Sequence, residues 1–168
     1  MRRPHTPAAR RRLTGVEGST IHCLPAPHLV PGVHAMAKEG LITIASSFDA
    51  KETVERLAAD IAAKGMTLFA RVDHAAGAAE VGVDLRPTEV LFFGNARGGT
   101  PLMQAEQTIG LDLPLKALVY EDADGKVWLA YNDPHWLAQR YGLGGNIAKN
   151  VDALANALSA VATKATRG

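Results

Sequence analysis

The sequence predicts an α+β fold in which an antiparallel sheet carries helices on one face. Three observations favour this class: a short β-branched run precedes a capped amphipathic helix, a hairpin connection joins two later strand patterns, and the other connections are short. The predicted order is strand, helix, strand, strand, two-stranded hairpin and helix, followed by a further helix at the C-terminus.

Composition sets the frame for this fold. The chain has 168 residues, of which 47% are apolar and 21% charged, so we expect one packed domain with a tail. The single cysteine, Cys23, excludes an internal disulfide and a four-cysteine zinc site. Residues 1–40 hold six basic and two acidic residues, whereas residues 41–168 hold 12 basic and 15 acidic ones.

The first segment, residues 1–38, shows neither helical nor strand periodicity and is expected to be a disordered basic tail rich in proline and histidine. Three interpretations stay open: contact with an anionic surface, a targeting peptide, or residues that precede a true start at Met36. No apolar run follows the arginines, which disfavours secretion, and no stretch is long enough to span a membrane. We therefore expect a soluble, cytoplasmic protein.

Residues 41–45 are predicted to form the first strand because they are short and rich in β-branched residues. Asp49 is the expected N-cap of the next helix, with Glu52 placed to complete a capping box and Gly65 placed to end the helix. Alternation over residues 66–73 predicts a second strand with Met66, Leu68, Ala70 and Val72 on one face, and His74 continues that face.

Residues 75–83 fit either a helical turn or a loop, and residues 88–94 form the third predicted strand. Thr100 and Pro101 are typical of a helix start, with a helix to about residue 108. Strands at 115–120 and 126–131 are joined by a turn at residues 122–125, and Asp133-Pro134 opens the next helix.

The C-terminal helix carries an apolar stripe at steps of three and four residues: Ile147, Val151, Leu154, Leu158 and Val161. The stripe is expected to be buried either on the domain's own sheet or on a partner subunit.

Five motifs occur in the order found in a known family: RVDHAAGA at residues 71–78, LFFGN at 91–95, GTPLM at 99–103, IGLDLPLK at 109–116 and YNDP at 131–134. Together they resemble the bacterial and archaeal domain-of-unknown-function family number 302, over about residues 39–143. The resemblance implies a β-α-β4-α fold of TATA-binding-protein-like architecture and a homodimer, with no established reaction. The helix over residues 144–168 lies outside it. The net acidic domain does not fit nucleic-acid binding.

His74, beside Asp73 at the end of a strand, is the first candidate site residue. Its imidazole could accept a proton or ligate a metal or haem iron, whereas the plainer interpretation is a half-buried histidine bonded to backbone or a carboxylate. Only scattered carboxylates are available as further ligands, so no metal site is assigned.

The loop at residues 94–100 is the second candidate, with Asn95, Arg97 and Thr100 as its polar residues. It follows a strand and opens a helix, as anion sites often do, but it lacks the lysine of a nucleotide phosphate loop. A simple glycine turn is the alternative.

The segment 109–114, including Asp112, is expected to form an apolar wall with Phe93, although core packing explains it equally well. We thus predict a small-ligand cleft bounded by His74, the loop and this wall. Alternatives are a metal- or haem-binding redox protein that uses His74, and a structural homodimeric module that uses the C-terminal stripe. Catalysis is left undecided, since no nucleophile motif or carboxylate pair is present.

Overall fold

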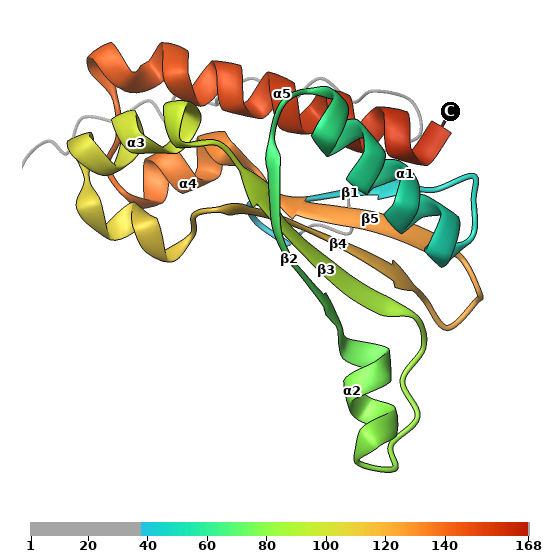
Figure 1. The fold of residues 1–168 in the computed structure, drawn as a ribbon. Helices are drawn as coiled ribbons and strands as arrows, with labels where there is room; N and C mark the ends of the chain where they lie inside the picture. The colour runs from blue at the N-terminus through green and yellow to red at the C-terminus, as the bar shows by residue number, and fades with distance from the viewer. Residues whose placement is uncertain (1–37, 168) are drawn as a thin grey trace, which may run out of the picture.

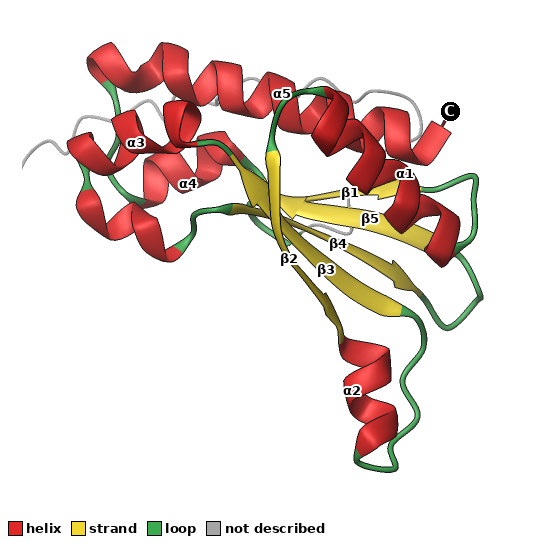
Figure 2. Cartoon of the chain, viewed as in Figure 1, coloured by secondary structure: helices red, strands yellow, loops and turns green. Residues whose placement is uncertain are grey.

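A computed structural model describes residues 38–167 and contains a five-stranded antiparallel sheet with the strand order β1-β5-β4-β3-β2 (Figures 1 and 2). The strands are β1 (Leu41–Ala45), β2 (Thr67–Asp73), β3 (Thr88–Gly94), β4 (Leu115–Glu121) and β5 (Val127–Asn132). The helices are α1 (Ala50–Ala63), α2 (His74–Glu80), α3 (Ala96–Ala105), α4 (Pro134–Arg140) and α5 (Ala148–Arg167), with 3-10 turns at Gln107–Leu111 and Gly145–Ile147. The predicted α+β class is confirmed. The tail expected over residues 1–38, including Cys23, lies outside the described residues except for Lys38.

One face of the sheet is covered by α1 and α5, which pack against each other (Figure 1). The core lies between these helices and the sheet. Its fully buried side chains include Leu57 and Ile61 of α1, Val161 of α5, and Leu91 and Phe93 of β3. At one end of the sheet lie α3 and α4, whereas α2 extends away from the opposite end (Figures 1 and 2).

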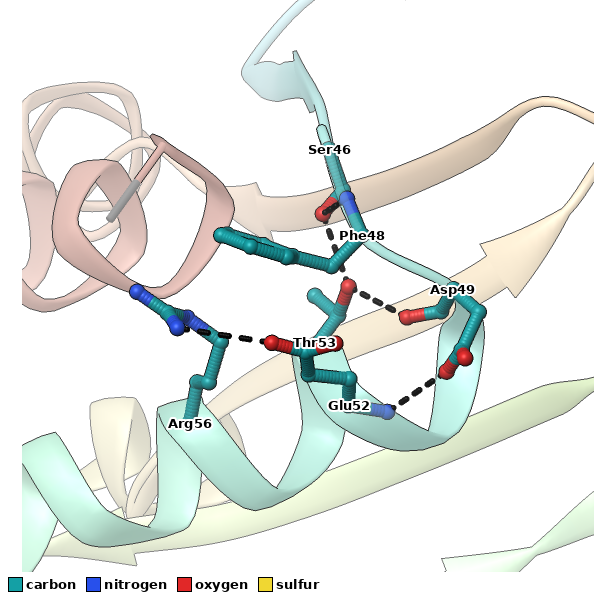
Figure 3. A network of polar contacts seen from close by, with 6 residues as sticks. All are labelled: Ser46, Phe48, Asp49, Glu52, Thr53 and Arg56. Carbon is teal, nitrogen blue, oxygen red and sulfur yellow. Dashed lines mark hydrogen bonds and ion pairs between the residues drawn. The ribbon is translucent and has the colours of Figure 1, made fainter.

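The start of α1 is held by a local polar network (Figure 3). The carboxylate of Asp49 accepts a hydrogen bond from the backbone N–H of Glu52 at 2.7 Å, as the sequence predicts. The hydroxyl of Thr53 donates to the carbonyl of Asp49 and lies 2.7 Å from the hydroxyl of Ser46. Glu52 bonds to Arg56 at 3.5 Å, so only the Asp49 half of the expected capping box is observed.

The predicted alternation along the second strand is wrong because β2 contains a bulge at Phe69. Leu68 pairs with Phe93, which faces the helices, but Ala70 pairs with Phe92, which faces the opposite side. The extra residue therefore moves Ala70 and Val72 to the face that α1 and α5 leave open.

The helix expected to start at Thr100 starts earlier. The side chain of Asn95 accepts a hydrogen bond from the backbone N–H of Gly98 at 2.8 Å, which makes Asn95 the N-cap of α3. Pro101 lies inside the helix and not at its first position. Asn95 is an equally good N-cap residue by type, but the three glycines that surround it disfavour a helix in sequence reasoning.

The apolar stripe of the C-terminal helix is buried within its own chain. Val151, Leu158 and Val161 of α5 have exposed fractions of 3%, 1% and 0%. Leu158 and Val161 belong to the main core, and Val151 packs in a second cluster with Leu102 and Ile109. Of the two expected arrangements, burial on the domain itself therefore accounts for the stripe except at Leu154, which is partly exposed.

Within residues 38–167, no helix is both long enough and apolar enough to cross a lipid bilayer.

Candidate functional site

A cleft of about 890 Å³ opens where the end of the sheet meets α3 and α5. Its floor and walls are mostly apolar and come from the α1–β2 turn, the end of β3, the start of β4 and one face of α5. The apolar side chains that line it are Met66, Phe69, Ala96, Met103, Leu113, Pro114, Leu115, Ala153, Leu154 and Ala157. Both the size and the composition are typical of sites for small organic molecules.

The loop between β3 and α3 forms one rim of the cleft, and its glycines keep that rim thin. A Cβ added to Gly98 would meet the side chains of Asn95 and Leu154 at 3.4 and 3.7 Å. A Cβ added to Gly99 would meet Leu113 at 3.5 Å. A methyl group at either position would therefore make ordinary van der Waals contacts with residues that line the cleft.

The opposite wall is a face of α5, because residues three and four positions apart lie on the same side of a helix. Asn150, Ala153, Leu154 and Ala157 follow this spacing and all line the cleft. Small alanine side chains at two of these positions leave the hollow unfilled.

The polar groups of the cleft are few: Lys64, Asn95, Arg97 and Asn150. The lining contains no aspartate, glutamate, histidine, serine or cysteine among the residues that the structure describes. The polar groups that this part of the chain offers to a molecule in the cleft are therefore two cationic groups and two amides.

Two of the predicted loop residues, Asn95 and Arg97, line this cleft, but Thr100 does not. Phe93 is fully buried in the core and does not reach the cleft. Leu113 and Pro114 supply the predicted wall, while Asp112 lies behind it.

Asp112 accepts a hydrogen bond from the hydroxyl of Tyr141 at 2.7 Å and lies 3.6 Å from the Lys116 ammonium. The bond to the carboxylate raises the pKa of Tyr141 above its ordinary value. Asp112 therefore has a positioning role: it fixes the segment before Leu113 against α4.

His74 lies away from this cleft, so the structure does not form the single cleft that was expected. It is the first residue of α2, at the end of β2 opposite to the cleft, and β2 itself spans about 20 Å. His74 instead borders a separate hollow of about 550 Å³ with Leu85, Arg86 and Tyr120. Asp73 caps α2 by accepting a hydrogen bond from the N–H of Ala76 at 2.9 Å.

Across residues 38–167, no three histidine, cysteine, aspartate or glutamate side chains are grouped in a way that could hold a metal ion. The structure thus gives His74 no partners for a metal site in this part of the chain.

Sequence reasoning missed Lys64, Phe69 and the α5 residues of the cleft. The only available indication was the small residues beside the apolar stripe of α5, and these give no hint of which element they face. Lys64 follows α1 directly, and its place at the cleft depends on the pairing of Thr67 with Gly94, which brings the α1–β2 turn beside the loop.

Three curated relatives match one segment of this chain. They are the proteins named fluoride-specific ion channel FluC 1 of Brucella suis and of Brucella abortus, and fluoride-specific ion channel FluC 2 of Brucella melitensis. Each is 53% identical over 117 residues, which cover 70% of this chain and 43–46% of the relative. The chain therefore spans less than half the length of the curated relatives it matches.

The fold matches the crystal structure of an uncharacterized conserved DUF302 protein from Bacillus stearothermophilus, with a TM-score of 0.68 and 19% identity. The match covers 76% of this chain and 99% of the other. A family model described as "Domain of unknown function DUF302" matches residues 42–161, which includes most of α5 and so extends past the limit of 143 that the motifs suggest. The resemblance to this family is thus confirmed, and the chain belongs to the DUF302 family.

Proposed function

We propose that this protein binds a small, mostly apolar organic molecule in the cleft between the 94–99 loop and α5. The observation that carries the proposal is a hollow of about 890 Å³ with an apolar lining and a few polar groups at its rim. The apolar lining is open to solvent, and a ligand that covered it would remove that apolar surface from water.

The proposal is tested by filling the cleft from α5. Ala157 lines the cleft and is only partly exposed, whereas Ala160 lies on the same helix, is exposed and does not line it. Ala157→Trp is expected to abolish binding of N-phenyl-1-naphthylamine, a neutral apolar fluorophore. Ala160→Trp, the matched control, is expected to keep the affinity within twofold of the parent protein. Equal binding by both variants, or no binding by the parent protein, would contradict the proposal.

A second candidate function is favoured by the relatives. Proteins named as fluoride-specific ion channels contain a segment 53% identical to this chain within a longer polypeptide. Segments that are joined in one polypeptide often serve the same process. We therefore also propose that this chain acts together with a fluoride channel.

This second proposal predicts a growth phenotype. Deleting the gene for this chain from its host should lower the sodium fluoride concentration at which growth stops, and restoring the gene should reverse the effect. Restoration with Ala157→Trp tells whether the cleft takes part. An unchanged fluoride tolerance in the deletion strain would contradict a role beside a fluoride channel.

We further propose that the chain self-associates through the segment around α2. Val81, Val83 and Leu85 follow α2 and are 75%, 56% and 47% exposed, which is unusual for large apolar side chains on a projecting segment (Figure 1). Replacing all three by serine should convert a dimer to a monomer in sedimentation velocity. A parent protein that already sediments as a monomer at micromolar concentration would exclude this proposal.

A further inference from the structure

The ionisable residues of the cleft are both cationic. Lys64 and Arg97 line it, and no carboxylate does so among the residues that the structure describes. Both side chains belong to exposed residues, so they lie at the mouth of the cleft and not in its depth. Of the apolar groups that line the cleft, Met66 and Leu154 are only partly exposed, whereas Met103 and Phe69 are 36% and 58% exposed.

Several cations elsewhere on the domain have an acidic partner, although others, such as Lys149, form no salt bridge within residues 38–167. Arg71 binds both Glu55 and Glu89, at 2.9 and 2.6 Å, and Arg56 pairs with Glu52. In contrast, no salt bridge within residues 38–167 includes Lys64 or Arg97.

The acid best placed in sequence to neutralise Lys64 is Asp60, one helical turn earlier on α1. Asp60 is instead bound by Lys164 of α5. The positive charge of Lys64 is thus left without this partner at the cleft mouth.

Resting on the proposed function, we infer that the cleft takes an anionic amphiphile, a molecule with an apolar body and one acidic group. The apolar body occupies the interior, and the carboxylate, sulfonate or phosphate group meets Arg97 and Lys64 at the mouth. A guanidinium group binds such oxyanions through two parallel hydrogen bonds, and an ammonium group adds a second positive charge. The same two charges disfavour a cationic ligand of equal size.

Two fluorophores with one carbon skeleton test this inference. N-phenyl-1-naphthylamine is neutral, and 8-anilino-1-naphthalenesulfonate adds a sulfonate to the same framework. The variant Lys64→Gln/Arg97→Gln is expected to bind the sulfonate probe about tenfold more weakly than the parent protein, since each contact at the mouth contributes about threefold to the affinity. Its affinity for the neutral probe should stay within twofold of the parent value. Added salt should weaken only the sulfonate.

Lys51→Gln is the matched control, because Lys51 is an exposed cation on α1 that does not line the cleft. It should leave both affinities within twofold. If Lys64→Gln/Arg97→Gln changes both probes equally, or neither, the charge inference fails while the cleft proposal stands on the neutral probe. If Ala157→Trp leaves the neutral probe bound, the cleft proposal itself fails and the inference falls with it.

Discussion

Lys164 of α5 donates a hydrogen bond to the carboxylate of Asp60 on α1, which joins residues 104 positions apart in the sequence. Asp60 is only 7% exposed, whereas the Lys164 side chain is 65% exposed. The two helices that cover the sheet are therefore tied by one polar contact beside their apolar interface.

Removing the lysine of this pair should destabilise the fold. Lys164→Ala is expected to lower the free energy of unfolding by about 1 kcal/mol, because a nearly buried carboxylate loses its donor. Urea unfolding provides the measurement. Lys149→Ala, at a lysine of α5 with no salt bridge within residues 38–167, should stay within about 0.5 kcal/mol of the parent protein. Equal effects of the two substitutions would contradict this account of Asp60.

His135 links α4 to α5 and should make stability depend on pH. Its Nε2 lies 2.9 Å from Asp152, and this hydrogen bond, followed by the charge of Asp133, raises the pKa of His135. Because the pKa is higher in the folded than in the unfolded protein, protonation of His135 stabilises the fold. This stabilisation is fully present below the ordinary pKa of 6.5 and is lost as the pH rises through the folded-state pKa.

The parent protein should therefore have a higher free energy of unfolding than His135→Gln at pH 5.5, and this difference should be smaller at pH 8.5. The difference is expected to stay below about 1 kcal/mol, because the His135 side chain is half exposed and its ion pairs are screened by solvent. Urea unfolding at both pH values measures it. A difference that is constant, or larger at pH 8.5, would show that these carboxylates do not act on His135.

Asp122 organises the hairpin between β4 and β5. Its carboxylate accepts hydrogen bonds from Asp124 N–H and Lys126 N–H, both at 2.9 Å, and from the Trp128 indole at 2.7 Å. The indole bond is the main cause of a lowered pKa for Asp122. Because the pKa is lower in the folded than in the unfolded protein, the ionised Asp122 stabilises the fold at pH values above the ordinary pKa of 3.8. This stabilisation is lost as the pH falls through the folded-state pKa.

Asp122→Ala is therefore expected to lower the midpoint of thermal unfolding at pH 7, and to lower it less at pH 3. Asp124→Ala is the matched control, because within residues 38–167 its exposed side chain makes no hydrogen bond. It should change the midpoint little at either pH. The account of the turn is wrong if both variants unfold at the same temperature.

Gly40 lies under the indole ring of Trp136 with a φ of +75°, and a Cβ there would overlap the ring. Gly40→Ala is expected to cost about 2–4 kcal/mol, from backbone strain together with the displaced indole. Gly125 has a φ of +73° with nothing within 4 Å of an added Cβ, so Gly125→Ala should cost only about 1 kcal/mol. If urea unfolding showed a similar loss of unfolding free energy for Gly40→Ala and Gly125→Ala, the contact of Gly40 with Trp136 would be excluded.

The strands and most helices could be predicted because their determinants are local. Asp49 and Asp133 cap α1 and α4 as their residue types indicate, and the strand at residues 88–94 has the predicted bounds. The bulge at Phe69 could not be predicted, since one inserted residue leaves no mark in the sequence pattern. It reverses which face Ala70 occupies, which is a consequence of pairing with β3.

The candidate site was half predicted for a similar reason. Asn95 and Arg97 follow a strand end, which is a local feature, and both line the cleft. The distance of His74 from them depends on the direction in which β2 runs beside β3. The wall formed by α5 depends on how a helix more than fifty residues later packs across the loop, and no local pattern specifies that.

The most direct test of the cleft is a titration of the isotopically labelled protein with N-phenyl-1-naphthylamine, followed by amide chemical shifts. We predict saturable shifts concentrated in the backbone amides of residues 94–99 and 150–157, and their loss in Ala157→Trp. Shifts confined to the surroundings of His74 and Arg86, or no saturable shift at all, would contradict a binding role for the cleft.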